Sequence, residues 1–113
     1  MEATTWDRIG RIREWLDAEG VQNSEADRRL LRVLKIGEEY GEVAEALHGA
    51  LGANPRKGAS HSWEDVRKEL CDVAVTTLVA LATLSPDAEK EFDDRLRHLV
   101  GRISPPREAG MSG

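Results

Sequence analysis

Four glutamates within residues 35–47, KIGEEYGEVAEAL, are the first side chains whose spacing could do chemistry. Glu38, Glu39, Glu42 and Glu45 would crowd into about two turns of one helix, where like charges one turn apart repel each other. A bound cation would offset this repulsion. A solvent-exposed polar face is the alternative, and it is the usual role of any one glutamate. Acids make up 21 of the 113 residues, so the pattern alone indicates little.

A second acidic pair, Glu69 and Asp72, stands at the entrance of a strongly apolar segment. Residues 73–84 carry no charge, and apolar residues fall on every side of a helical projection, which predicts a buried helix. Burying unpaired carboxylates is costly, so the pair needs a partner. That partner is either a salt bridge from Arg67 or Lys68, or a metal ion.

The two acidic segments together predict a metal site. Glu39 and Glu42 are an i,i+3 pair on one predicted helix, and Glu69 and Asp72 are an i,i+3 pair on another. If the two pairs face each other, they form a cage of four carboxylates. Oxygen ligands alone suit a hard cation, so we expect Mg²⁺, with Mn²⁺ as a possible substitute, rather than zinc.

Iron is a lesser alternative. Glu45 and His48 have the Glu-x-x-His spacing that di-iron helical bundles use. Such bundles need the motif twice, and the sequence holds one copy of it.

Four helices must position these residues, because apolar residues recur at three- and four-residue spacing and no segment resembles a strand between turns. Gly20 and Gly52 are expected to end helices, and Asn23 or Ser24 and Ser62 are expected to be N-caps. Ser85-Pro86 is expected to start the last helix. The expected helices cover residues 5–19, about 25–51, 63–84 and 86–102. The sequence therefore predicts an all-α domain over residues 1–103, followed by a disordered tail, 104–113.

Composition narrows the classes of partner. A net charge of −5 argues against a nucleic-acid partner. The longest uncharged run, 73–86, is too short to span a bilayer, and the N-terminus has no signal-peptide core. The single cysteine, Cys71, fits a reducing compartment, so we expect a cytoplasmic protein without a membrane partner.

The acidic motifs also carry a family likeness. EEYGE at 38–42 followed by ELCD at 69–72 resembles the EExxE…ExxD signature of MazG-like nucleoside triphosphate pyrophosphohydrolases, which are all-α enzymes related to dimeric dUTPases. The resemblance covers residues 30–84. It implies a four-helix bundle-like, MazG-type fold that oligomerises through its helices into a homodimer or homotetramer. It also implies Mg²⁺-dependent cleavage of a (d)NTP or a modified nucleotide to a nucleoside monophosphate and pyrophosphate.

The resemblance assigns roles by position. Glu39, Glu42, Glu69 and Asp72 would be metal ligands. Glu38 would be the catalytic residue, either holding a further metal or orienting the attacking water.

Four further residues are candidates for substrate binding. Lys35 could reach a phosphate, or it could simply pair with Glu39 one turn away. Arg56 and Lys57 lie on the predicted loop between the acidic helices and could close on a triphosphate, or be an exposed basic loop. Trp63 could stack on a base.

The last predicted helix departs from the family pattern. Family members carry Lys, Asn and Arg there for phosphate, whereas this helix has no asparagine and offers Arg95, Arg97 and Arg102. A second reading therefore stays open. The chain could be a catalytically weak helical module that senses nucleotides or binds partner proteins.

Overall fold

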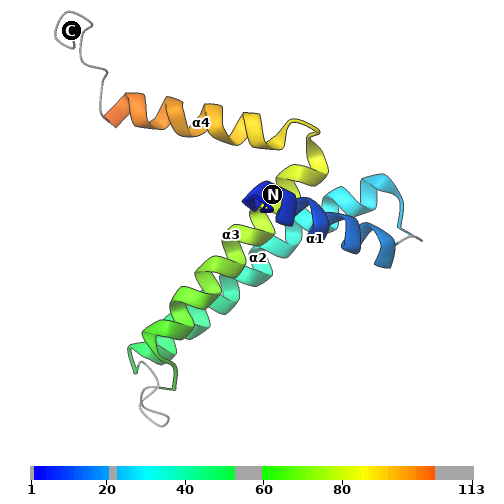
Figure 1. Cartoon of the computed structure of the whole chain (residues 1–113). Helices are drawn as coiled ribbons and strands as arrows, with labels where there is room; N and C mark the ends of the chain where they lie inside the picture. The colour runs from blue at the N-terminus through cyan, green and yellow to red at the C-terminus, as the bar shows by residue number, and fades with distance from the viewer. Residues whose placement is uncertain (1, 21–22, 53–59, 104–113) are drawn as a thin grey trace, which may run out of the picture.

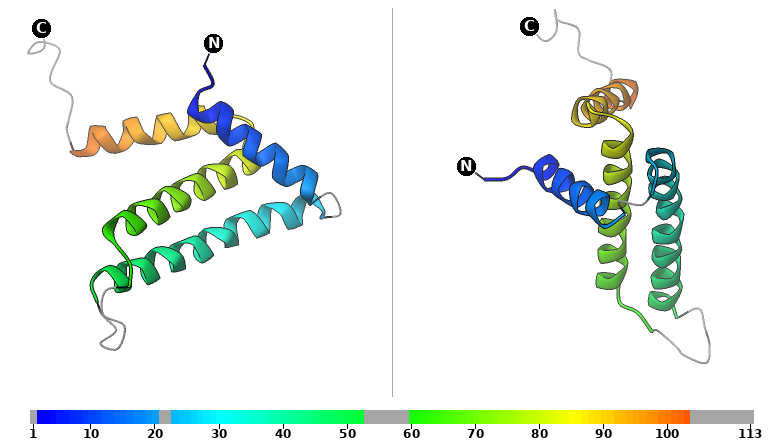
Figure 2. Two further views of the ribbon diagram at one scale, coloured as in Figure 1. Left: turned by 60° about the horizontal axis from the view of Figure 1, so that its bottom comes forward. Right: turned by 90° about the vertical axis from the view of Figure 1, so that its right-hand side faces the viewer.

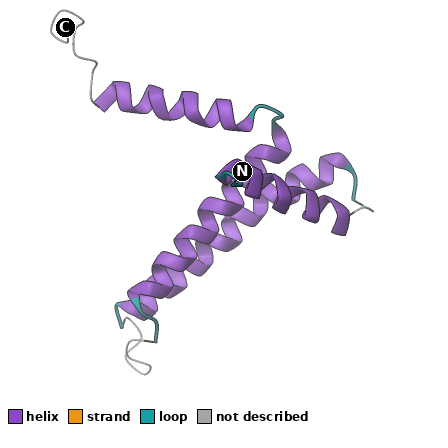
Figure 3. Cartoon of the chain, viewed as in Figure 1, coloured by secondary structure: helices purple, strands orange, loops and turns teal. Residues whose placement is uncertain are grey.

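The computed structural model describes residues 2–20, 23–52 and 60–103 (Figure 1). Every regular element in these ranges is a helix (Figure 3). The helices are α1, Thr5–Glu19; α2, Glu25–Ala50; α3, Trp63–Leu84; and α4, Ala88–Ile103. The predicted all-α class is confirmed. The predicted disordered tail, 104–113, lies outside the described residues.

The predicted caps begin and end the two acidic helices. Ser24 starts α2, and its hydroxyl accepts a hydrogen bond of 3.1 Å from the Asp27 amide. Ser62 and Asp65 form a reciprocal capping box at the start of α3, with bonds of 3.2 and 2.9 Å. Beyond α2, Gly52 adopts a φ of 66°, a conformation that favours glycine. Local sequence therefore sets where these helices stop.

The start of α4 differs from the prediction by two residues. Pro86 and Asp87 form a turn, and the helix begins at Ala88 rather than at residue 86. The Ser85 hydroxyl accepts a 3.0 Å hydrogen bond from the Asp87 amide, and the Asp87 carbonyl accepts one of 3.0 Å from Glu91. The Asp87 carbonyl is thus the first hydrogen-bond acceptor of α4, and the Ser85 hydroxyl stabilises the turn that precedes the helix.

The helices form an antiparallel pair with two additions. α2 and α3 lie side by side along most of their lengths, and α1 packs across α3 (Figure 2). α4 bends away from α3 by 119° and extends from the pair (Figure 1). Its contact with α1 includes Phe92, which meets Trp6 edge-on with ring centroids 6.0 Å apart. The four helices therefore do not close into a bundle within one chain.

The core is small and consists mainly of short side chains. Its buried apolar residues are Ile9, Val43, Ala46, Val66, Val79, Ala80 and Ala88. The prediction that residues 73–84 are buried on every side is wrong for the single chain, because α1 and α2 cover α3 on part of its surface. Val75 is 37% exposed and Leu84 is 48% exposed.

One ionic network ties α1, α2 and α3 together. The guanidinium of Arg32, whose side chain is 11% exposed, lies 2.7 Å from the Asp17 carboxylate and donates a 3.1 Å hydrogen bond to the Thr83 hydroxyl. Burial raises the pKa of Asp17, but the hydrogen bond and charge of Arg32, helped by Arg13 and Arg28, outweigh it. The net pKa of Asp17 is therefore below its ordinary value.

Among the described helices, none is by itself long and apolar enough to cross a membrane. α3 and α4 have the required length and composition only as a joined pair, and that pair is bent by 119°.

Candidate metal centre

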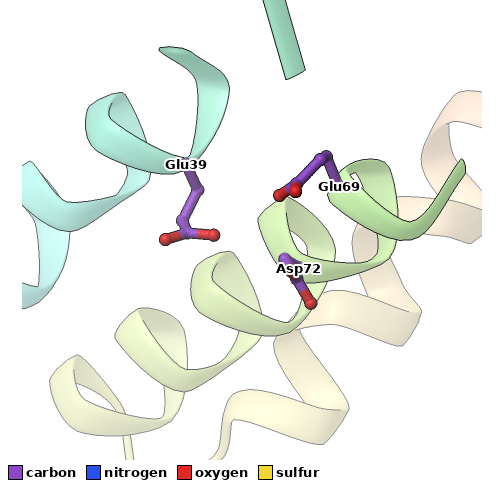
Figure 4. A group of neighbouring side chains, drawn as sticks. All are labelled: Glu39, Glu69 and Asp72. Carbon is purple, nitrogen blue, oxygen red and sulfur yellow. The ribbon is translucent and has the colours of Figure 1, made fainter. Parts of the chain in front are cut away.

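Three carboxylates from two helices meet between α2 and α3. Glu39 comes from α2, and Glu69 and Asp72 come from α3 (Figure 4). Each offers a carboxylate oxygen, and these oxygens all lie within 4.8 Å of one another. Glu39 shares the inward stripe of α2 with the buried residues Val43 and Ala46, at i+4 and i+7. The packing that forms the core therefore also turns this carboxylate toward α3.

The group is partly shielded from water. The side chains of Glu39 and Glu69 are 18% and 21% exposed, and that of Asp72 is 45% exposed. Because shielding lowers the effective dielectric constant, like charges repel more strongly here than on an open surface. The three carboxylates thus need a positive charge nearby.

On the α3 side, Lys68 supplies part of that charge. Its ammonium nitrogen lies 3.4 Å from the Asp72 carboxylate and 3.7 Å from that of Glu69. The hydrogen bond with Asp72, followed by the charges of both acids, raises the pKa of Lys68. The salt bridge that we considered as the alternative to a metal is therefore present.

On the α2 side, Lys35 has the same role. Its nitrogen lies 3.3 Å from Glu38 and 3.7 Å from Glu39. The hydrogen bond and charge of Glu38 are the main causes of its raised pKa. Both lysine side chains are more than half exposed, so each can move into solvent and leave the carboxylates to a cation.

The donor set fits Mg²⁺. All three groups offer oxygen, and Mg²⁺ favours oxygen ligands in an octahedral arrangement while keeping several waters. Three protein carboxylates leave coordination positions for water and for a phosphate oxygen. Because the three carboxylates carry more negative charge than one divalent ion neutralises, the neighbouring lysines remain useful when a cation is bound.

The other acids of α2 lie outside this group. Glu42, a predicted ligand one turn beyond Glu39, is exposed and does not belong to the three-carboxylate group. Its role as a ligand stays a prediction. Glu38 is exposed and pairs with Lys35. Glu45 and His48, the pair considered for iron, are both exposed on α2.

The predicted substrate contacts fall in several places. Lys35 borders the carboxylate group through Glu39, and Trp63 is the first residue of α3, 53% exposed. Arg56 and Lys57 lie outside the described residues. Arg97, on the projecting helix α4, pairs with Asp93 and Asp94 of its own helix.

Sequence reasoning missed a groove that begins beside the carboxylates. It has a volume of about 400 Å³ and lies between α1, α2 and α3. On α2 the groove is lined by Arg28, Arg32 and Lys35. Together with Glu39 they follow one another at spacings of four, three and four residues, so all four share one side of the helix. That spacing was visible in the sequence, but the opposite walls come from distant segments.

Comparison of the chain with protein-family models, with curated proteins and with solved structures found no match. The function proposed below therefore rests on the motif spacing and on the geometry of the carboxylate group.

Proposed function

We propose that the protein is a Mg²⁺-dependent nucleoside triphosphate pyrophosphohydrolase. It would cleave a (d)NTP or a modified nucleotide between the α- and β-phosphates. The observation that carries the proposal is the convergence of Glu39, Glu69 and Asp72 from two helices. These are three of the four ligand positions that the resemblance assigns, and Glu39 lies 30 or more residues before the other two in the sequence.

The reaction needs a positioned water and charge compensation at the phosphates. Glu39, Glu69 and Asp72 would hold Mg²⁺, which when bound polarises phosphoryl oxygens and lowers the pKa of a coordinated water. Glu38, exposed beside the group, would orient the attacking water and accept its proton. The water oxygen bonds to the α-phosphorus while the bond from that phosphorus to the bridging oxygen breaks, and pyrophosphate leaves. Lys35 would neutralise charge on the phosphates.

Pyrophosphate release tests the proposal. A panel of canonical and modified (d)NTPs is incubated with the protein in Mg²⁺, in Mn²⁺ and in EDTA. Metal-dependent release is expected from the wild type, and Glu69→Gln should abolish it. Glu45→Gln is the matched control, because Glu45 is an exposed acid of the same motif region outside the group. Absence of release from every nucleotide, in a folded protein, would refute the activity.

We further propose that two or four copies assemble through their helices. α2 exposes a second apolar stripe that includes Leu30, Leu34 and Tyr40, which are 58%, 59% and 66% exposed. A second copy would cover this stripe and complete the helical packing around α3. Light scattering after gel filtration should give a mass of at least two chains, and Leu34→Glu should lower it.

The projecting helix favours one second candidate, a protein-interaction module. α4 exposes Phe92, Leu96, Leu99 and Ile103, which share one side of the helix. A module of this kind would bind nucleotide or protein without turnover. Binding of nucleotide in Mg²⁺ without pyrophosphate release would favour it over the enzyme.

A further inference from the structure

The groove between α1, α2 and α3 begins one helical turn from the carboxylate group. On α2, Lys35 lies one turn before Glu39 and lines the groove. On α3, Thr76 lies one turn after Asp72 and also lines it. Since the two helices are antiparallel, both walls run away from the carboxylates in the same direction (Figure 2). A ligand held by a cation at the carboxylates would extend into this groove.

The walls suit the organic part of such a ligand. Aliphatic side chains from all three helices line the groove, and three of them are incompletely covered: Ile12, Leu31 and Val75 are 39%, 52% and 37% exposed. A volume of about 400 Å³ lies within the range of small-molecule pockets. Apolar walls with a few polar groups are typical of sites that hold a flat organic ring.

The cations of the groove differ in how well they are paired. Arg32 is bonded to Asp17 and Thr83, and Lys35 lies beside Glu38 and Glu39.

Arg28 is paired less completely. Its Nη2 donates one long hydrogen bond, 3.3 Å, to the Asn23 carbonyl. Its Nε is shielded from solvent and has no hydrogen-bond partner among the described residues.

An unbonded, shielded N–H is unfavourable, so the observed arrangement of Arg28 is poorly satisfied. An acceptor in the groove would stabilise a rotamer that turns the guanidinium toward it. Arginine only donates hydrogen bonds, whereas Arg32 and Lys35 of the same wall already lie against acids. One acid, Glu19 at the end of α1, also lines the groove. At Arg28 itself the wall therefore favours an electronegative oxygen over an amino group.

We infer that the groove holds the nucleoside of the substrate and that Arg28 determines specificity by donating to an oxo oxygen of the base. The protein then prefers bases with an oxo group over their amino counterparts. This inference rests on the proposed function, because it places the phosphates at the carboxylate group.

Two pairs of nucleotide analogues, each pair differing at one position of the base, test this inference without requiring turnover. The probes are α,β-methylene analogues of inosine and adenosine triphosphates, which differ by a 6-oxo or 6-amino group, and of uridine and cytidine triphosphates, which differ at position 4. Binding is measured by titration calorimetry in Mg²⁺. The wild type should bind each oxo compound roughly tenfold or more tightly than its amino partner, as expected for a hydrogen bond to a charged donor. Arg28→Met should bring both ratios close to one.

Inorganic tripolyphosphate controls for the phosphate end. It lacks a nucleoside, so its affinity in Mg²⁺ should be the same for the wild type and for Arg28→Met. If Arg28→Met does not fold, as judged by circular dichroism, Arg28→Gln replaces it. Glutamine both donates and accepts hydrogen bonds, so this variant should also lose the preference.

The outcomes separate the two proposals. Equal binding of oxo and amino compounds by the wild type overturns the inference, as does a preference that survives substitution of Arg28. An oxo preference that depends on Arg28, in a protein that releases no pyrophosphate from natural nucleotides, supports the inference and refutes the enzyme. Failure to bind any nucleotide overturns both.

Discussion

Replacing Glu39 with glutamine should change stability in opposite directions with and without Mg²⁺. Without the cation, Glu39 repels Glu69 and Asp72 and attracts Lys35. With the cation, the proposed function makes Glu39 a ligand. Because glutamine keeps the shape of the side chain and removes its charge, Glu39→Gln isolates the electrostatic effect.

The geometry gives the size of the effect without metal. At 4.8 Å and the dielectric constant of water, each carboxylate pair repels by about 0.9 kcal/mol. The Lys35–Glu39 pair at 3.7 Å involves an ammonium group that is half exposed, so solvent screens this attraction. The two repulsions therefore outweigh it, and in EDTA the variant should be more stable by about 1 kcal/mol.

With Mg²⁺, the order should reverse. At a concentration ten times its Kd, a ligand that binds only the folded state stabilises it by about 1.4 kcal/mol. For a domain of this size, that shift raises the Tm by roughly 6 °C. The variant, which lacks one of the three carboxylates, should show little of this rise.

Differential scanning calorimetry of the wild type, Glu39→Gln and Glu45→Gln, in EDTA and across a Mg²⁺ titration, measures both effects. Glu45 is an exposed acid of the same helix outside the group, so Glu45→Gln should respond to Mg²⁺ as the wild type does. The reasoning is refuted if Glu39→Gln gains as much from Mg²⁺ as the wild type. It is also refuted if this variant is less stable than the wild type in EDTA.

Two further perturbations test the packing that supports the site. The pKa of Asp17 lies below its ordinary value of 3.8, so its contribution is present above that pH and is lost as pH falls through the folded-state pKa. Asp17→Asn should lower the free energy of unfolding by about 1.5 kcal/mol at pH 7. Urea titrations should show this difference between variant and wild type shrinking below pH 3.8. A difference that does not change with pH would contradict the role of the Asp17 charge. Gly49 is buried, and a Cβ there would overlap the His61 ring and approach the Ser60 hydroxyl to 2.6 Å. Gly49→Ala should therefore destabilise the folded protein by about 1–3 kcal/mol, despite alanine's better helix propensity. Adding His61→Ala should restore part of this loss in the double variant. A Gly49→Ala protein that is more stable than the wild type would disprove the overlap.

Local sequence predicted the helices because their signals are local. The hydroxyl of Ser24 or Ser62 reaches an amide three residues away, and the glycine at 52 adopts a left-handed conformation wherever the chain around it goes. The same reasoning failed at the start of α4. There, Ser85 bonds two residues ahead instead of three, so a turn precedes the helix.

The sequence by itself also determined which residues offer metal-binding chemistry. Carboxylate oxygens at i,i+3 spacing on two apolar helices pointed to a hard cation, and three of the four predicted ligands, Glu39, Glu69 and Asp72, do meet. Helical periodicity fixes only which residues of one helix share a face. It says nothing about the rotation of that helix against its neighbour.

Tertiary structure decided the rest, because burial and proximity depend on which faces of different helices meet. The rotation of α2 against α3 turns Glu39 inward and leaves Tyr40 66% exposed, although both residues belong to the same acidic stretch. The bend of 119° after α3 removes α4 from the pair and leaves the apolar side of α3 partly uncovered. The groove that ends at Arg28 needs walls from three helices, and only their packing brings those walls together.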